Sequence, residues 1–212
     1  MNSDPGDWGH TILLYSSNTA SNWLDQLTLK HKKPSNKDVD EEMPGVSFIG
    51  SGNYARLKLI PAFKKHNASL RYLSSIGGLS STIAGKKYGF NKSTTDLENI
   101  FDDKNSQAVV ISTRHDSHAD LIIRSLQSGK DIYVEKPMCL TLEELEKISI
   151  CHNETIEKGI NPIIMVGFNR RFSPQIIKIK ELLTKINQPK SVVMTINAGA
   201  LPSNHWINDK KI

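Results

Sequence analysis

From about residue 45 onward, the chain alternates between two hydrophobic patterns. Short runs that are apolar throughout have the length of β-strands, and the stretches between them place an apolar residue every three or four positions, as amphipathic helices do. The expected strands cover residues 45–50, 69–76, 107–113, 131–135 and 162–168. The expected helices cover residues 53–66, 79–89, 116–130 and 141–159, the last opened by a Thr141 cap with Glu144 three residues later. Because strands that are apolar throughout are buried on both faces, we expect a doubly wound α/β domain, a parallel sheet covered by helices on both sides.

The first 44 residues lack this pattern. One short apolar run at 11–17 is followed by a polar, lysine-rich stretch at 30–45. So few apolar side chains cannot offset the roughly 1–2 kcal/mol per residue that fixing a backbone costs, and we expect residues 30–44 to be ill-ordered. The expected organisation is an N-terminal arm or linker at 1–44, a complete α/β domain at 45–188 and the start of a second α/β domain at 189–212.

Composition and charge narrow the classes of protein. The net charge of +5 would permit nucleic-acid binding, but the basic residues come in small groups without interleaved aromatic residues, so we expect no nucleic-acid partner. We expect instead that the mildly basic surface attracts phosphorylated ligands. No apolar run approaches the ~20 residues of a membrane span, and the first ten residues lack a signal-peptide pattern, so we expect a soluble, cytoplasmic protein. Cys139 and Cys151 indicate neither a disulfide framework nor a zinc site.

A glycine-rich turn joins the first expected strand to the first expected helix. It reads G-x-G-x-x-A, the form of a dinucleotide-binding fingerprint, and consists of Gly50, Ser51, Gly52, Asn53, Tyr54 and Ala55. Gly50 permits the tight turn, Gly52 lets the backbone approach a pyrophosphate, and Ala55 lets the helix pack close to the strand. An ordinary glycine turn is the alternative, but the strand before it and the helix after it favour a bound dinucleotide, with helix N-terminal amides facing the phosphates.

The choice between NAD and NADP stays open at this stage. The second expected strand ends without the acidic residue that would hydrogen-bond the adenosine ribose and repel a 2′-phosphate. Ser74 or Ser75 could hydrogen-bond either a ribose hydroxyl or a phosphate.

Two polar clusters, at 111–118 and 133–137, follow expected strands at the edge where α/β sheets bind ligands. Together with the fingerprint, the segments ISTRHDSH and YVEKP resemble sequence motifs of the Gfo/Idh/MocA oxidoreductases. The sequence segments at 167–174 and 197–209 are more similar still to one half of certain two-domain proteins of that family. In those proteins a zinc-alcohol-dehydrogenase-like domain comes first and the oxidoreductase half follows. The resemblance covers roughly residues 45–209.

The resemblance implies a catalytic role for Lys136. It matches the lysine of the family's E-K-P motif, which lies near the nicotinamide and the substrate and assists proton transfer at the carbon–oxygen group that exchanges hydride. An ammonium can supply both a proton and a positive partner to a developing alkoxide. In the oxidising direction, a cationic nicotinamide and partial burial would favour the lower lysine pKa that the reaction needs. Glu135 would orient Lys136, and both residues are expected among those that bind the cofactor. A solvated lysine in a strand–helix turn is the alternative.

The resemblance also implies residues around the cofactor and the substrate. Thr113, Arg114 and His118 match the segment that lines the nicotinamide ribose, although Arg114 and the histidine after it replace the usual proline-asparagine, and His118 capping the next helix is an alternative. Arg170 matches an arginine near the cofactor. Asn169 and Arg171 would face the substrate, or the two arginines would be solvated at the start of a helix.

A second domain and a substrate class follow from the same resemblance. His205 and Trp206 would suit a sugar-binding cleft, or Trp206 would be ordinary core, and residues 191–200 look like the first strand of the substrate domain. The chain is expected to be a truncated NAD(P)-dependent oxidoreductase acting on a sugar or cyclic polyol, and to form a homo-oligomer only in a full-length form. A dinucleotide-binding domain without activity, regulatory or vestigial, is the alternative.

Overall fold

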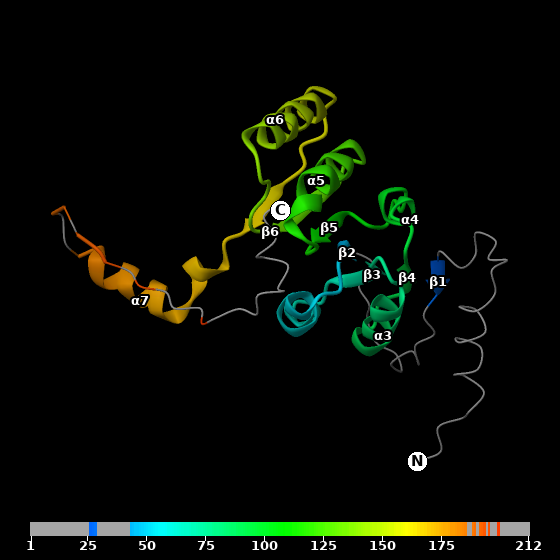
Figure 1. The fold of residues 1–212 in the computed structure, drawn as a ribbon, viewed down its shortest axis with the longest axis horizontal. Coiled ribbons are helices and arrows are strands. Elements are labelled where there is room, and N and C mark those ends of the chain that lie inside the picture. The colour runs from blue at the N-terminus through cyan, green and yellow to red at the C-terminus, as the bar shows by residue number, and fades with distance from the viewer. Residues whose placement is uncertain are drawn as a thin grey trace, which may run out of the picture.

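Figure 1 shows the computed structural model of the chain as a ribbon. The structure describes residues 26–28, 43–185, 188, 189, 191–193, 195 and 199. A sheet with helices on both faces forms the body of the described chain. The doubly wound α/β class expected from the hydrophobic pattern is confirmed.

The sheet has seven strands in the order β1-β4-β3-β2-β5-β6-β7. They are β1 (Gln26–Thr28), β2 (Gly45–Ile49), β3 (Ser69–Ser74), β4 (Lys92–Thr94), β5 (Ala108–Ile111), β6 (Asp131–Glu135) and β7 (Ile164–Gly167). All neighbours pair in parallel except β1, which runs antiparallel to β4. Five strands match the expected runs, whereas the sequence pattern missed β1 and β4, each of which has three residues.

The strand order reverses at β2. The chain passes from β2 to β3 and β4 on one side, and then returns to place β5, β6 and β7 on the other. The loops that follow β2 and β5 therefore diverge from each other beyond the carboxyl ends of these two strands. This is the position where open α/β sheets bind ligands.

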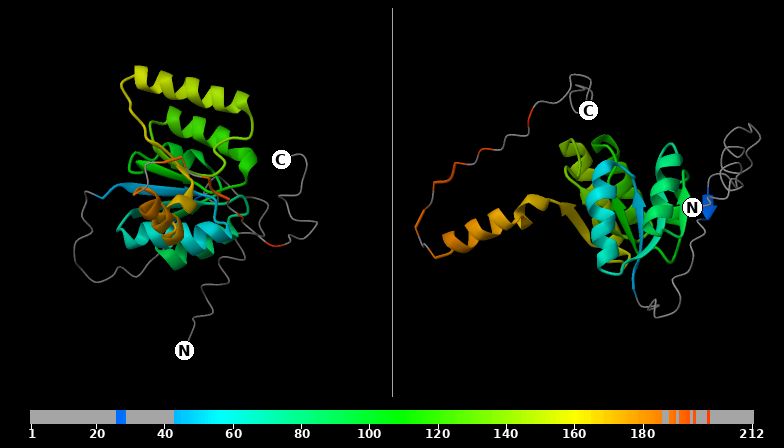
Figure 2. Two further views of the ribbon diagram at one scale, coloured as in Figure 1. Left: turned by 90° about the vertical axis from the view of Figure 1, so that its left-hand side faces the viewer. Right: turned by 90° about the horizontal axis from the view of Figure 1, so that it is seen from below.

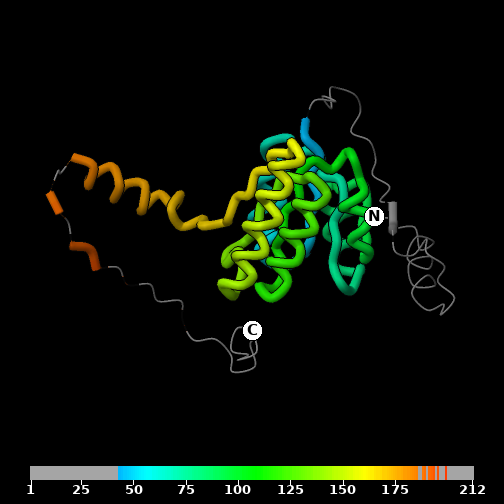
Figure 3. Tube along the Cα trace, turned by 90° about the horizontal axis from the view of Figure 1, so that it is seen from above, coloured from blue at the N-terminus to red at the C-terminus, as the bar shows by residue number. Residues whose placement is uncertain are grey.

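The helices form one layer on each face of the sheet, as Figure 2 shows. One layer contains the helical turn η2 (Ala55–Leu59), α2 (Ile60–Lys65) and α3 (Leu79–Tyr88). The other contains α4 (Glu98–Phe101), α5 (His118–Gln127) and α6 (Leu142–Glu157), with α5 and α6 side by side in Figure 3. Each layer has its own apolar core against the sheet. In the first, buried Phe48 of β2 packs edge-to-face on Phe63 and Phe90, with ring centroids 5.4 and 5.6 Å away.

The start of α6 follows the sequence prediction. The hydroxyl of Thr141 accepts a hydrogen bond from the Glu144 amide at 3.1 Å, and the Glu144 carboxylate accepts from the Thr141 amide at 3.2 Å. These two bonds form a capping box, which satisfies amides that the first helical turn leaves unpaired. None of the helices within the described ranges has the length and apolar character to cross a membrane.

Beyond β7, the turn η4 (Asn169–Phe172) leads into α7 (Pro174–Leu183), which extends away from the sheet in Figures 1 and 3. The strand expected at 191–200 is absent from the residues of that range that the structure describes, which are 191–193, 195 and 199. Residues 30–42, His205 and Trp206 lie outside the described residues, and the domain boundary at 188 stays a prediction.

Candidate active site

The fingerprint turn begins directly after β2 and needs a glycine at its first position. Gly50 has φ +104°, and a Cβ atom there would lie 2.6 Å from the carbonyl oxygen of Ser112. The Gly50 amide donates to the Ser74 carbonyl at 2.9 Å, which ties the turn to the end of β3. Gly52 differs, because a Cβ atom there would meet nothing within 4 Å. Its open side leaves room for a ligand to approach the backbone.

A groove of about 1150 Å³ opens over this turn, beyond the carboxyl ends of β2, β3 and β5. We call it the fingerprint groove. It brings together nine residues predicted to bind a cofactor: Gly50, Ser51, Gly52, Asn53, Tyr54, Ala55, Ser75, Thr113 and Arg114. Two loops far apart in sequence, 50–55 and 112–117, therefore contribute to one site.

Three serine hydroxyls form a chain along one wall of the fingerprint groove. Ser80 donates to Ser75 at 3.0 Å, and Ser51 lies 2.9 Å from Ser80, so that Ser51 donates to it in turn. The Ser75 oxygen also accepts from the Ser81 amide at 3.2 Å. The hydrogen of Ser75 then points to no acceptor among the described contacts, and it suits a ribose hydroxyl and a phosphate equally.

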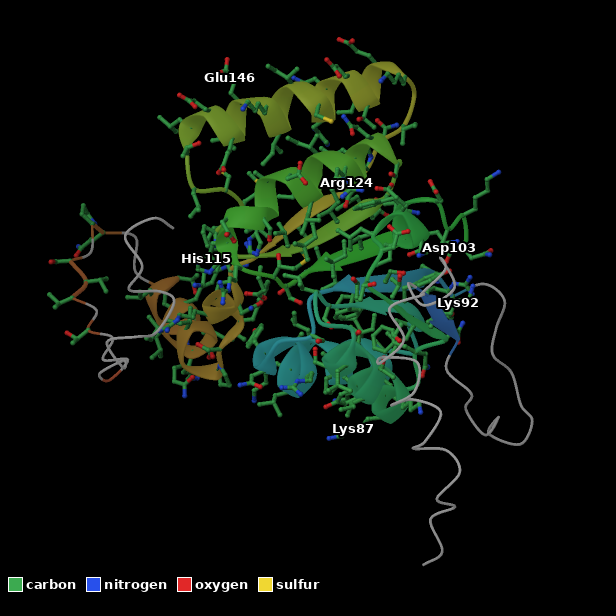
Figure 4. The ribbon with its side chains drawn as sticks, turned by 45° about the vertical axis from the view of Figure 1, so that its right-hand side comes forward. Lys87, Lys92, Asp103, His115, Arg124 and Glu146 are labelled. Carbon is green, nitrogen blue, oxygen red and sulfur yellow. The ribbon has the colours of Figure 1, made fainter. Side chains whose placement is uncertain are left out.

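Five further residues of the fingerprint groove were not predicted from the sequence. Thr95, Leu97, Asp116, Asp120 and Arg124 also line the groove. Arg124, labelled in Figure 4, pairs with Glu98 and stacks on the Phe101 ring, with 4.4 Å between guanidinium carbon and centroid. Asp120 and Arg124 are four residues apart on α5 and share a helix face, and this spacing is the signal that could have identified them.

Lys136 directly follows β6, at the same edge of the sheet as the fingerprint turn, because β2, β5 and β6 are parallel. This position agrees with the sequence prediction, although the side chain is exposed rather than partly buried and does not line the fingerprint groove. The neighbouring His115, labelled in Figure 4, lies in the turn η3 (His115–Ser117). Its pKa is lowered by burial first, and then by the charges of His118 and Lys136. Lys136 is therefore electrostatically coupled to the loop after β5.

Glu135 was expected to orient Lys136, but its carboxylate has other partners. Tyr133 donates to Glu135 at 2.9 Å, and the side-chain amide of Asn169 donates to it at 3.1 Å. No ion pair among the described residues joins Glu135 to Lys136. Gly167 makes room for this arrangement, because a Cβ atom there would lie 2.7 Å from the Glu135 carboxylate and from the Tyr133 hydroxyl.

Asn169 links this cluster to the fingerprint turn. Its amide nitrogen also donates to the Tyr54 hydroxyl at 2.7 Å, and its oxygen lies 3.1 Å from the Tyr133 hydroxyl. Burial and the Glu135 charge raise the pKa of Tyr54, and burial and the hydrogen bond to Glu135 raise that of Tyr133. Both phenols remain hydrogen-bond donors over a wide pH range. The structure thus places Asn169, which was predicted to bind substrate, against Tyr54 and Glu135, which were predicted to bind cofactor.

His118 and the two arginines lie elsewhere. His118 is fully buried behind the groove wall, where its ring contacts the backbone carbonyls of Thr113 and Pro137. Arg170 and Arg171 are exposed in η4, and the Arg171 guanidinium stacks on Phe172 at 4.7 Å from the ring centroid. Neither arginine lines the fingerprint groove.

The parallel sheet, the glycine turn and the groove at the strand reversal define a dinucleotide-binding domain of the Rossmann type. The open side of Gly52 and the hydroxyl chain at Ser75 fit a pyrophosphate and an adenosine ribose. The family model for the oxidoreductase family with an NAD-binding Rossmann fold matches residues 45–157. The chain belongs to this family, the Gfo/Idh/MocA oxidoreductases. The expected cofactor class, NAD or NADP, is confirmed at the level of the family.

Curated relatives include several polyol and sugar dehydrogenases. The chain is 38% identical over 89 residues to scyllo-inositol 2-dehydrogenase (NAD(+)) from Bacillus subtilis, covering 42% of this chain and 25% of the relative. It is 27% identical over 165 residues to myo-inositol 2-dehydrogenase from Thermotoga maritima, covering 77% and 46%. The chain therefore spans less than half the length of these relatives.

Solved structures give the same likeness. The myo-inositol dehydrogenase of Lactobacillus casei, in complex with NAD(H) and myo-inositol, has a TM-score of 0.59 and 25% identity, covering 68% of this chain and 42% of that one. A levoglucosan dehydrogenase in complex with NADH and levoglucosan has a TM-score of 0.59 and 26% identity, covering 68% and 40%.

Proposed function

We propose that the chain is the cofactor-binding part of an NAD(P)-dependent oxidoreductase that transfers hydride to or from a sugar or a cyclic polyol. The observation that carries the proposal is the fingerprint groove, which joins a glycine turn to the polar loop after β5 in a chain of this family. The substrate class rests on its relatives, which include dehydrogenases of inositols and levoglucosan.

In this proposal, the backbone of residues 51–55 holds the pyrophosphate of the cofactor, and Ser75 holds the adenosine ribose. Thr113 and Arg114, on the opposite loop, border the nicotinamide half. Oxygen and amide groups of this kind bind a dinucleotide by hydrogen bonds, and the helix N-terminus adds its favourable dipole. When bound, the nicotinamide ring accepts or gives the hydride.

Lys136 then acts at the carbon–oxygen group of the substrate. In reduction, its ammonium donates a proton to the oxygen while the carbon receives hydride, so a carbonyl becomes an alcohol. In oxidation, the neutral amine takes the hydroxyl proton while the carbon loses hydride. The cluster of Glu135, Tyr133 and Asn169 holds the strand end that carries Lys136, and Asn169 and Arg171 are the candidates for contact with substrate, together with His205 and Trp206.

Several finer expectations belong to the same proposal. We propose that the full-length enzyme works in the cytoplasm as a homo-oligomer, and that this chain corresponds to the oxidoreductase half of a two-domain protein with a zinc-alcohol-dehydrogenase-like domain in front. The sequence segments at 167–174 and 197–209 support the proposal of a two-domain protein. Sequencing the gene on both sides of this chain tests it directly.

Cofactor titration tests the central proposal. NADH and NADPH are titrated into the wild type and Gly52→Val, with binding followed by nicotinamide fluorescence. A branched side chain at Gly52 would enter the open space over the turn, so we expect both cofactors to bind at least about tenfold more weakly. Lys65→Val, an exposed change at the far end of the same helical segment, is the control and should bind as the wild type does. Equal affinity in wild type and Gly52→Val would refute the groove as the cofactor site.

Turnover is measured separately in the full-length enzyme, with inositols and anhydro-sugars as substrates. Oxidation or reduction that depends on Lys136 would support the enzyme reading. Cofactor binding without turnover on any of them would favour the alternative, a dinucleotide-binding domain without activity.

A further inference from the structure

His118 is a buried histidine whose ring does not line the fingerprint groove and whose polar contacts go to two loops outside its own helix. It is the first residue of α5, and its side chain is 0% exposed. Nδ1 lies 2.7 Å from the carbonyl oxygen of Pro137, and Nε2 lies 3.3 Å from that of Thr113. Thr113 follows β5 and Pro137 follows β6, so the ring bridges the loops after two adjacent parallel strands.

The contacts argue against a simple helix-capping role. A capping side chain would accept hydrogen bonds from amides of the first turn of α5. Both partners of His118 are instead carbonyl oxygens of other loops, and these can only accept. The shorter contact assigns the N–H of the neutral ring to Nδ1, with the Pro137 carbonyl as its acceptor. Nε2 then has no hydrogen to donate, so its 3.3 Å approach to the Thr113 carbonyl is a packing contact.

We infer that His118 is a positioning residue for Lys136. By holding the Pro137 carbonyl, one residue beyond Lys136, it fixes the backbone that carries the ammonium relative to Thr113 on the groove wall. The inference rests on the proposed role of Lys136 in proton transfer. It extends that role, because it names the group that aligns the lysine with the cofactor site.

Electrostatic coupling supports the same arrangement. The His115 and His118 rings lie edge-to-face, with 5.7 Å between centroids. Burial lowers the pKa of His115, and the charges of His118 and Lys136 lower it further. The three side chains thus interact at the point where the two loops meet. A small displacement of a proton-transfer group is costly to catalysis, so a buried ring at this point has a functional consequence.

Three variants of the full chain separate the hydrogen bond from mere packing. His118→Phe keeps a ring but removes both nitrogens. His118→Asn keeps an amide nitrogen close to the place of Nδ1 and can still donate to Pro137. The matched control is His152→Phe in α6, because the His152 ring also contacts a proline carbonyl, that of Pro162 at 3.3 Å, away from the groove.

Hydrogen exchange followed by mass spectrometry tests the positioning without requiring turnover. The peptide at 136–141 contains amides of Leu140 and Thr141 that are hydrogen-bonded to Glu144. We expect exchange in this peptide to rise about tenfold in His118→Phe, to stay within about threefold of wild type in His118→Asn, and to be unchanged in His152→Phe. Unchanged exchange in His118→Phe, or an equal rise over the whole domain, would overturn the inference. If His118→Phe does not fold, His118→Asn still decides, because wild-type exchange supports the inference and raised exchange at 136–141 contradicts it.

Kinetics supply the functional readout. In His118→Phe, kcat should fall at least about tenfold while the affinity for NADH changes less than about threefold, and His118→Asn should recover most of kcat. A fall in NADH affinity with kcat unchanged would overturn the inference and make His118 a support of the groove wall alone. These kinetics are measured in the full-length enzyme. If that enzyme shows no turnover in the wild type, the proposed function fails, whereas the exchange experiment still determines whether His118 holds the Lys136 backbone.

Discussion

The two glycines of the fingerprint turn should respond oppositely to the same small substitution. Gly50→Ala places a methyl carbon 2.6 Å from the Ser112 carbonyl oxygen and 3.0 Å from the Thr113 amide nitrogen, at a φ of +104°. Gly52→Ala adds the same methyl carbon where nothing lies within 4 Å. The first variant should lose stability, and the second should lose cofactor affinity.

The expected magnitude for Gly50→Ala combines two terms. A left-handed backbone costs a residue with a Cβ atom about 1–2 kcal/mol, and forcing an extra carbon into packed surroundings costs about 1–3 kcal/mol. The sum is a loss of roughly 2–5 kcal/mol in the free energy of unfolding, which lowers the melting temperature by roughly 5–20 °C for a domain of this size. Gly52→Ala should change stability by less than about 1 kcal/mol, because its methyl group meets open space.

Thermal unfolding followed by circular dichroism, and NADH titration of the same samples, measure the two effects. Gly52→Ala should melt with the wild type and bind NADH about tenfold more weakly, since its methyl group projects toward the ligand. A Gly50→Ala protein that melts with the wild type would refute the steric argument at Ser112. A Gly52→Ala protein that binds NADH normally would refute the placement of the pyrophosphate.

Other residues of the site give further expectations. In a full-length enzyme, Lys136→Ala should lower turnover by a factor of ~10²–10⁴ while NADH affinity stays nearly unchanged. Lys136→Arg should lower turnover nearly as much, because a guanidinium hardly exchanges its proton. Substantial turnover in Lys136→Arg would mean that Lys136 acts mainly by its charge. Tyr133→Phe should cost about 1 kcal/mol in the free energy of unfolding at pH 8. The pKa of Tyr133 is raised in the fold, first by burial, so the extra stability of the wild type is complete below the ordinary tyrosine pKa of ~10 and should shrink as pH rises above it. Denaturant unfolding of both proteins at pH 8 and pH 10.5 measures this change. A stability difference that stays constant would contradict the hydrogen bond to Glu135. Asn169→Ala should weaken NADH binding by a few-fold by releasing Tyr54, whereas Asn161→Ala, another exposed asparagine, should not.

The sequence predicted the elements that have a strong hydrophobic signal. The runs that became β2 and β5 are buried along most of their length, so burial and sequence pattern coincide there, and β6 is buried at Ile132 and Val134. β4 escaped prediction because its three residues are polar. Ser93 and Thr94 are nevertheless buried: the Ser93 hydroxyl donates to Thr82, whose own hydrogen goes to the Gly78 carbonyl, and the Thr94 hydroxyl accepts from the Asp96 amide. A scan for apolar runs cannot detect a strand that is buried through paired hydroxyls.

In the candidate site as well, the features set by local sequence could be predicted, whereas those set by contacts between distant segments could not. The glycine turn could be predicted because its geometry depends on local backbone, and Gly50 alone determines much of it. The contacts of Asn169 could not, because it bonds to Tyr54 of the fingerprint turn and to Glu135 at the end of β6, and only the completed sheet brings these segments together. The role of His118 also depends on the distance between two loops, and no spacing along the chain encodes that distance.

The antiparallel pairing of β1 with β4 has a consequence for the behaviour of the protein in concentrated solution. β4 would otherwise present the unpaired amides and carbonyls of an outermost strand, and such an edge is a template for pairing with another molecule. β1 covers these groups with three residues from a segment distant in sequence, so it acts as a cap against aggregation. Shortening the chain from its N-terminus past Thr28 would therefore leave the fingerprint groove in place but expose a strand that invites self-association.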